Sequence, residues 1–319
     1  MKEQFAKFHS LLALLLIVVA LSLATNSFLT VQNGLNVLQQ ISINLCLSIG
    51  MTMIILSGGI DLSVGSVLAL AGAVAAGLLK NGITFSRWDV VLDFTVFGAV
   101  LAGILTGMAC GWMNGFVITR FRVPPFVATL GMLTIARGLT RLWTGGFPIT
   151  NLDDGFVFLG AGRYLGVPMP VWISAALVAV FVVVTRRTRF GRYLFAVGGN
   201  ERAAKLSGLN VNRIKLLVYT LGGGLAGVAG LILAARLDAA DPKVGVGYEL
   251  DSIAAVVIGG TSLSGGRGSI LGTVLGCLII GVLNNGLVLL GVSDDWQLVT
   301  KGLVIIVAVA IDRASRRED

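Results

Sequence analysis

Long apolar runs recur from one end of this sequence to the other, and they restrict the chain to a membrane environment. Of its 319 residues, 55% are hydrophobic and only 13% are charged, with a mean hydropathy of +0.90. Ordinary soluble domains carry about 25% charged residues. A run of about 20 apolar residues matches the hydrocarbon thickness of a bilayer. We therefore predict an all-α fold, a polytopic membrane helix bundle of about ten transmembrane helices with glycine-interrupted segments.

The apolar runs are expected to form a single transmembrane domain over residues 1–319. Lys2 and Lys7 precede the first run, which is either a cleaved signal peptide or, as the further runs favour, an uncleaved first span. The runs cover approximately residues 11–24, 36–57, 67–79, 90–118, 125 onward, 172–185, 214–235, 253–258, 270–290 and 296–311.

Residues 186–215 form the one long polar segment. They hold eight of the 24 Lys and Arg residues against a single acid, Glu201. Such a basic bias is typical of cytoplasmic loops. Within the segment, Asn200 is suited to cap a helix and Gly208 to end one. A short cytoplasmic helix is therefore predicted over residues 200–209, between two spans.

Basic residues also predict the orientation of the whole chain. With ten spans, about 16 basic residues lie in cytoplasmic segments and about six in outer ones. Both termini are then cytoplasmic, with Arg316 and Arg317 at the inner end of the chain, and the acidic loops at 144–167 and 236–251 are on the outer face. Because basic residues in the short loops beside the spans account for the net charge of +8, no nucleic acid partner is expected.

Two glycine-rich breaks interrupt the apolar runs in similar ways. GGIDLSVG at 58–65 and GGTSLSGG at 259–266 share the pattern G-G-x-x-L-S-x-G. Interrupted segments at corresponding places in two halves indicate the transport pathway of repeat-built transporters. The span count puts both breaks on the same side, so an inverted repeat does not follow. Coincidence in a glycine-rich sequence is the alternative interpretation.

Charged and polar side chains inside the runs are the candidates for a pathway. Asp61 lies in the first break, where a carboxylate is either a functional residue or, with Ser63, a cap of the following helix. Arg137 lies within a run and needs a partner or an aqueous neighbour, or must extend towards a membrane interface. The further pathway candidates, each of which is equally well an interhelical hydrogen bond, are Asn44, Thr52, Asn114, Asn284 and Asn285.

Helical spacing predicts how several runs pack. Polar residues at 44, 48 and 52 share one face, which should contact protein and not lipid. Small residues every four positions from Ala99 to Gly115 form one face where helix backbones approach closely. A second set of small residues, between positions 223 and 234, offers the same kind of surface.

The sequence carries no motif for catalysis. It has no G-x-x-x-x-G-K-[ST] phosphate loop, no H-E-x-x-H motif and no cysteine cluster at metal spacing. The pair Gly198-Gly199 is expected to be a turn, and Cys46, Cys110 and Cys277 to be small core residues. We therefore expect no catalytic residues, no metal site and no cofactor bound by this chain. A carboxylate relay would have only Asp61.

Four separated motifs carry a resemblance to a known family. TRFGRYLFAVGGNERAAKLSGLNVNRIK resembles the coupling loop of permease subunits of bacterial ATP-binding cassette sugar importers, the ribose, xylose, galactose and autoinducer-2 group. ILSGGIDLSVGS, AVVIGGTSLSGGRGSILGT and VLNNGLVLLGVS are similar to the other signatures of that group. The likeness extends from about residue 29 to residue 312 and looks closest to the ribose branch.

The resemblance implies a permease in the bacterial inner membrane that conducts a monosaccharide, ribose in the first place. It implies three protein partners: a second permease copy, an ATPase subunit with two nucleotide-binding cassettes and a periplasmic sugar-binding protein. The lipid bilayer surrounds the permease. ATP and Mg²⁺ are then used by the ATPase. The alternatives are another small sugar or autoinducer-2 as substrate, or a self-sufficient secondary carrier.

In such importers a cytoplasmic helix fits a cleft on the ATPase. In this sequence the coupling loop corresponds to residues 186–215. The role carries over to Gly198, Asn200, Glu201, Ala203, Ala204, Leu206, Ser207 and Gly208. Arg202 stands where the wider importer pattern E-A-A-x-x-x-G has glutamate, which we interpret as a mark of the sugar subgroup.

Overall fold

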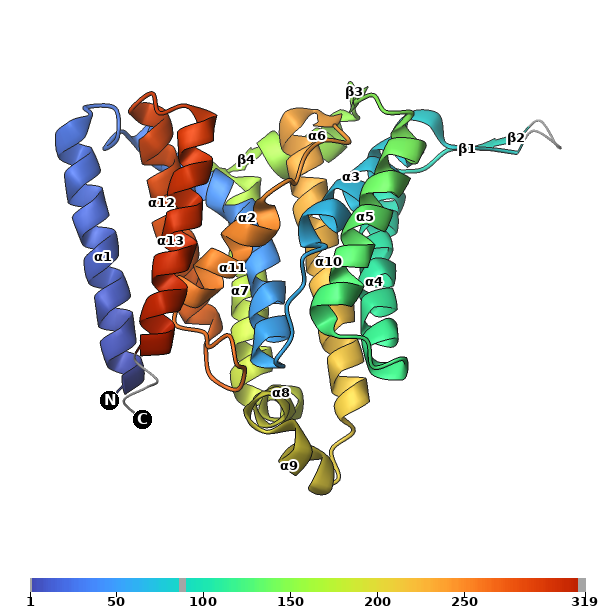
Figure 1. The fold of residues 1–319 in the computed structure, drawn as a ribbon. Helices are drawn as coiled ribbons and strands as arrows, with labels where there is room; N and C mark the ends of the chain where they lie inside the picture. The colour runs from blue at the N-terminus through green and yellow to red at the C-terminus, as the bar shows by residue number, and fades with distance from the viewer. Residues whose placement is uncertain (1, 86–89, 315–319) are drawn as a thin grey trace. The chain divides into compact units, whose positions relative to one another are not determined.

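The computed structural model describes residues 2–85 and 90–314, which form two compact units (Figure 1). The first unit takes in Met1–Gly58, Ala175–Leu209 and Leu250–Asp319, and the second takes in Gly59–Ser174 and Asn210–Glu249. Each unit thus combines segments that are far apart in the sequence. The single domain expected over residues 1–319 stays a prediction. Arg316 and Arg317 lie outside the described residues.

The first unit is built from both ends of the chain and from its middle. Its helices are α1 (Lys2–Ala24), α2 (Val31–Leu56), most of α7 (Met169–Arg187), α8 (Arg189–Gly199), α9 (Glu201–Leu206), most of α11 (Tyr248–Ile258), α12 (Ile270–Leu289) and α13 (Asp294–Ala314). Helix α12 packs against both α1 and α2. Glycine suits these contacts, because a Cβ on Gly281 would meet Ile41 and one on Gly286 would meet Leu21.

The second unit is centred on three helices that pack against one another. Its helices are α3 (Val64–Asn81), α4 (Val96–Arg120), α5 (Pro125–Thr144), α6 (Asp154–Ala161) and α10 (Val211–Leu237). Three antiparallel pairs of short strands join them: β1 (Ile83–Phe85) with β2 (Val90–Leu92), β3 (Ile149–Thr150) with β6 (Ala239–Ala240), and β4 (Arg163–Tyr164) with β5 (Val167–Pro168). Helix α10 packs on α3, α4 and α6.

Within the described residues, six helices are long and apolar enough to cross a membrane: α2, α3, α4, α7, α10 and α12. The chain is therefore an all-α, multi-pass membrane protein, as predicted. This count does not confirm the expected number of about ten spans. Helix α11 has 11 residues, too few to cross about 30 Å of hydrocarbon.

The predicted packing face on α4 is confirmed. A Cβ on Gly107 would meet the backbone of Gly223, and one on Gly111 would lie 3.0 Å from the Gly223 Cα. A Cβ on Gly115 would lie 3.0 Å from the Leu216 Cα. Gly223 and Leu216 lie on α10, so the backbones of α4 and α10 touch along this line. Only small residues allow such a close approach. The opposite side of α4 exposes large apolar side chains such as Phe97 and Trp112, as expected of a helix that faces lipid.

Two local predictions were wrong. The run expected over 90–118 begins as strand β2, and α4 starts only after Thr95, whose side chain accepts a hydrogen bond from the Gly98 N–H at 3.2 Å. Gly198 and Gly199, expected to be a turn, are the last two residues of α8. Helix α8 itself was not predicted. The sequence signal for it is the spacing of Gly191, Leu194 and Val197, which line its buried face.

Candidate functional site

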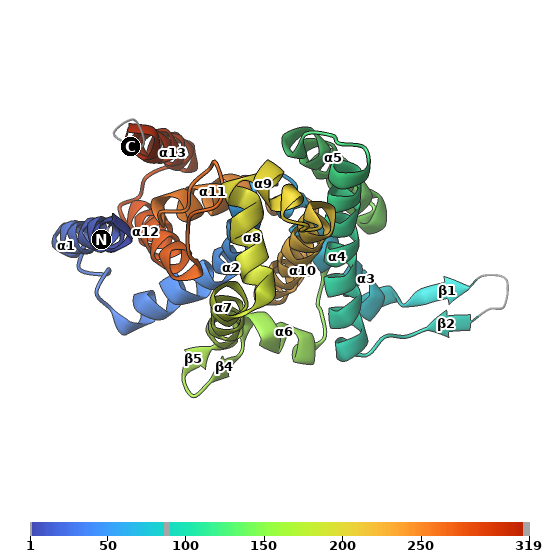
Figure 2. The same cartoon turned by 90° about the horizontal axis from the view of Figure 1, so that it is seen from below.

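Helix α9 is the short helix predicted over residues 200–209, and the structure confirms its caps. The Asn200 side chain accepts a hydrogen bond from the Ala203 N–H at 2.9 Å. Gly208 follows the helix with a φ of +83°, a left-handed conformation that glycine adopts without strain. Helix α8 leads from α7 to α9 (Figure 2). The polar segment is therefore two consecutive helices and not one helix in a loop.

The residues that the resemblance assigned to ATPase coupling differ in exposure. The exposed ones are Asn200, Glu201, Ala203, Leu206, Ser207 and Gly208. Ala204 is buried, while Leu206 is 84% exposed. Gly198 lies on α8 and its surroundings belong to this same unit: a Cβ there would overlap the Leu56 O and lie 2.6 Å from the Gly266 N. Thus α9 offers an open surface, and Gly198 packs closely against other segments of its own unit.

The first glycine break contains a buried polar network in the second unit. Asp61 is 2% exposed, and its Oδ1 accepts hydrogen bonds from the Ser63 N–H at 2.7 Å and the Ser63 hydroxyl at 2.6 Å. The Asn114 amide donates to the Ser63 Oγ at 3.0 Å. The Leu62 N–H donates to the Thr129 Oγ1 at 3.2 Å. The structure thus brings together Asp61, Ser63 and Asn114, and ties the break to α4 and α5.

Ser63 occupies the N-cap position of α3 without acting as a side-chain cap. Its hydroxyl makes no hydrogen bond to the helix N–H groups, because it donates to Asp61 and accepts from Asn114. Asp61 instead holds the turn that leads into α3 through the Ser63 N–H. The Thr129 contact was not predicted, although a lone threonine inside an apolar run is a usual site of hydrogen bonding between helices.

Three of the pathway candidates of the first unit have partners on other helices. The Ser252 hydroxyl donates to the Asn44 Oδ1 at 3.1 Å, and the Thr52 and Thr273 hydroxyls lie 2.6 Å apart. Asn285 and Asn33 exchange two amide hydrogen bonds of 2.9 Å each. These contacts hold α2 against α11 and α12, which agrees with the expected protein-facing side of α2.

Asn284 differs from the other polar candidates. Its Oδ1 is buried and has no hydrogen-bond partner among the described residues. A buried amide oxygen without a partner is costly in a protein interior. Asn284 is therefore the candidate in the first unit whose hydrogen-bonding capacity is still open.

Arg137 lies on α5, and its side chain has polar partners in the loop after α10. Its Nη1 donates to the Pro242 O at 2.8 Å and to the Val244 O at 2.6 Å. Both acceptors are main-chain carbonyls of the second unit, so the guanidinium holds this loop against α5. Of the three possibilities left open by the sequence, the structure therefore shows a polar partner for Arg137.

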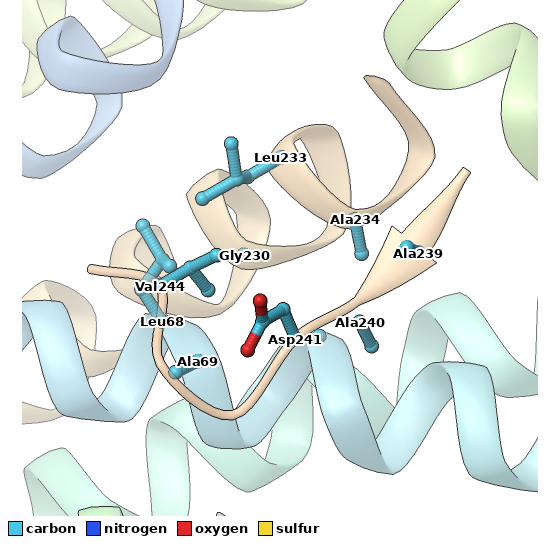
Figure 3. A pocket seen from close by; sticks show the side chains of 10 residues that line it. Leu68, Ala69, Gly230, Leu233, Ala234, Ala239, Ala240, Asp241 and Val244 are labelled. Atoms are coloured by element: carbon cyan, nitrogen blue, oxygen red, sulfur yellow. The ribbon is translucent and has the colours of Figure 1, made fainter. Parts of the chain in front are cut away.

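A small cavity lies beside that loop. Residues of α3, α10 and the segment after β6 line it, and the Asp241 carboxylate points into it (Figure 3). Its volume of about 10 Å³ is near the lower limit for one water molecule. Sites for small molecules are some thirty times larger or more, roughly 300–1,000 Å³. This cavity is therefore too small to bind a sugar.

Metal ligands and reactive thiols are not features of the described residues. No group of three or more His, Cys, Asp or Glu side chains there is arranged to hold a metal ion. Cys46, Cys110 and Cys277 are free and buried, which confirms their prediction as small core residues.

Comparison with known proteins gives a family match over most of the chain. Residues 33–309 match the family BPD_transp_2, described as the permease component of branched-chain amino acid transport systems. No solved structure matches the chain. The family description names amino acids, so the individual relatives carry the information about substrates.

Several relatives resemble this chain over nearly their full length. The ribose import permease protein RbsC of Escherichia coli K12 is 48% identical over 95% of this chain and 92% of its own length. RbsC of Bacillus subtilis 168 is 48% identical over 96% and 92%. The D-allose transport system permease protein AlsC of Escherichia coli K12 is 40% identical over 94% and 90%.

Proposed function

Because this chain belongs to the family of permease components of branched-chain amino acid transport systems, we propose that it forms the membrane pathway of an ATP-driven importer for ribose. As a permease component it is a transport protein and not an enzyme. The observation that supports ribose as the substrate is the 48% identity to ribose import permeases over 95% of the chain. The lower identity to the allose permease, 40%, supports ribose over allose.

In this proposal the energy comes from a separate ATPase subunit with two nucleotide-binding cassettes, and a periplasmic sugar-binding protein delivers ribose. The chain itself binds no cofactor, and ATP and Mg²⁺ are used by the ATPase. The absence of a phosphate-loop motif from the sequence supports this division of labour. The ATPase contacts α9, where Leu206 offers an apolar side chain and Glu201, Ala203 and Ser207 surround it on the exposed side.

The proposed topology has about ten spans, both termini in the cytoplasm and two permease copies per importer. One observation supports the orientation: in Figure 1 the start of α1 and the end of α13 lie at the same end of the first unit as α9. A basic segment such as 186–215 belongs on the cytoplasmic side. The second copy is proposed from the resemblance to sugar importers.

The proposed pathway residues are those that the sequence singled out: Asn44, Thr52, Asp61, Ser63, Asn114, Asn284 and Asn285. Asn284 is favoured in the first unit because its buried Oδ1 is unpartnered among the described residues. The others have partners within their own unit, so ribose would have to compete with these hydrogen bonds.

Reconstitution tests the proposed function. The permease is placed in liposomes with the ATPase and the sugar-binding protein encoded beside it, and labelled ribose uptake is measured with and without ATP. We expect uptake against a gradient only when all three proteins and ATP are present, with excess allose or xylose competing weakly. Absence of ATP-driven ribose uptake would contradict the proposal.

A self-sufficient carrier is the second candidate, because Asp61 is a buried carboxylate in a glycine break. The same liposomes decide between the two functions. Ribose accumulation by the permease alone, driven by a proton or sodium gradient, would support the carrier and exclude an obligatory ATPase.

A further inference from the structure

Two adjacent glycines at the end of α8 have very different surroundings. A Cβ on Gly198 would overlap the Leu56 O and lie 2.6 Å from the Gly266 N, so no side chain fits there. A Cβ on Gly199 would have no atom within 4 Å. Glycine disfavours a helix relative to every residue except proline. At Gly198 the close approach of other backbones leaves no room for a side chain, whereas a side chain at Gly199 would be unobstructed.

Three distant segments of the first unit meet at Gly198. Leu56 is the last residue of α2, where carbonyl groups lack partners within the helix, and its oxygen accepts a hydrogen bond from the Gly266 N–H at 3.0 Å. A Cβ on Gly265 would lie 2.8 Å from the Gly198 O and 3.1 Å from the Gly58 N. We name residues 56–58, 198 and 265–266 the glycine joint. Figure 1 shows the end of α2, helix α8 and the loop before α12, which supply these residues, close to one another.

The glycine joint includes parts of both glycine-rich breaks. Gly58 begins the first break, and Gly265 and Gly266 end the shared motif of the second. Gly198 is two residues from Asn200, which caps α9. Backbone atoms in close contact cannot move apart by a change of rotamer, as side chains can. A shift of one of these segments must therefore displace the others. The joint is thus a short and stiff connection between α9 and both breaks.

We propose that Gly198 is a positioning residue that transmits displacement of α9 to the end of α2 and to the second glycine break, and that it does not contact the ATPase itself. This inference rests on the proposed function, because the ATPase supplies the displacement. It differs from the role that the resemblance gives Gly198, which is a place on the surface that docks to the ATPase.

The test compares Gly198→Ala with Gly199→Ala, a matched control one residue away. Each variant is purified with the ATPase, placed in liposomes with the sugar-binding protein, and assayed for ATP hydrolysis and ribose uptake. Gly199→Ala should behave as the unaltered protein. Gly198→Ala should still co-purify with the ATPase and support ATP hydrolysis, while ribose taken up per ATP falls by about ten-fold or more, since the joint must open to admit a methyl group.

Other outcomes separate the possible failures. Equal uptake per ATP in Gly198→Ala and the unaltered protein would overturn the inference. Loss of ATPase co-purification from folded Gly198→Ala would also overturn it, in favour of direct docking. If the unaltered protein takes up no ribose with ATP, the proposed function has failed, whatever the variants do.

A second measurement does not depend on the folding of Gly198→Ala. Spin labels replace two exposed side chains in the first unit, Arg192 on α8 and Arg267 immediately after the second break, in an importer that still transports ribose. Because the joint moves as one piece, their separation should change by less than about 2 Å when ATP binds, the size of an ordinary helix shift. A larger change during active transport would overturn the inference.

Discussion

Among single residues, Asp61 illustrates how a buried charge can be interpreted in two ways. The sequence places it in a glycine break at membrane depth, which suits either a pathway residue or a cap. In the structure its Oδ1 holds the turn into α3 through two hydrogen bonds from Ser63, and Asn114 completes the network. This arrangement favours a structural role, in which the carboxylate fixes the backbone of the break.

The contrast between Asp61→Asn and Asp61→Ala tests that role. An asparagine oxygen can still accept from the Ser63 N–H, so Asp61→Asn should keep most ribose uptake. Asp61→Ala removes the acceptor and should lower the free energy of unfolding by about 1–3 kcal/mol, measured in detergent mixtures containing increasing SDS. Abolished uptake in folded Asp61→Asn would indicate that the charge itself is needed and would favour the carrier.

Among the elements, α9 was predictable and α8 was not predicted. The caps of α9 are local signals, Asn200 before the helix and Gly208 after it, and neither needs tertiary contacts to act. Gly198 lies near the end of α8, and it must be glycine because the backbone of Leu56 leaves no room for a side chain. Leu56 lies 142 residues earlier in the chain. A glycine pair in a polar segment therefore suggested a turn, and no local pattern indicates that glycine is needed there for a close contact with a distant segment.

Leu206 tests the proposed docking surface of α9. Leu206→Asp should weaken binding to the ATPase by about 30-fold, because a buried apolar contact is typically worth about 2 kcal/mol. Leu206→Met keeps an apolar side chain and serves as the control. Both variants should fold, since Leu206 is 84% exposed. ATPase binding is measured by titration in detergent, and unchanged affinity in Leu206→Asp would remove α9 from the interface.

For the whole molecule, the sequence indicates the class of protein more firmly than the number of spans. Six described helices qualify as spans by length and composition, whereas the prediction is about ten. Helix α11 shows why counting is difficult, because its 11 residues form a helix inside the bundle that apolar character alone cannot distinguish from a span. Hydropathy reports burial from water, and it does not report whether a helix crosses the whole bilayer.

Cysteine labelling tests the orientation of the chain. With a membrane-impermeant maleimide, Ser207→Cys should react in inside-out vesicles and stay unlabelled in intact spheroplasts, because α9 is proposed to be cytoplasmic. Lys243→Cys, exposed in an expected outer loop, should show the opposite pattern. The native cysteines are buried, so their background is low. Labelling of Ser207→Cys from outside intact spheroplasts would reverse the proposed topology.

The side chains of the candidate site were largely predictable, and their partners were not. Single residues inside apolar runs stand out in a sequence, which is how Asp61, Arg137 and Asn285 were identified. Their partners, such as the Pro242 carbonyl and Asn33, lie on segments about 100 to 250 residues away. No local pattern encodes which of many polar groups will be adjacent after packing.

By itself the sequence determined that the chain is a helical membrane protein, where α9 begins and ends, and that α4 has a face of small residues. These properties depend on hydrophobicity, periodicity and capping, which act over a few residues. Only the tertiary structure decided that Leu56, Gly198 and Gly266 share one contact. That contact arises because folding brings the ends of α2 and α8 together with the loop before α12, and the space left between these backbones admits glycine alone.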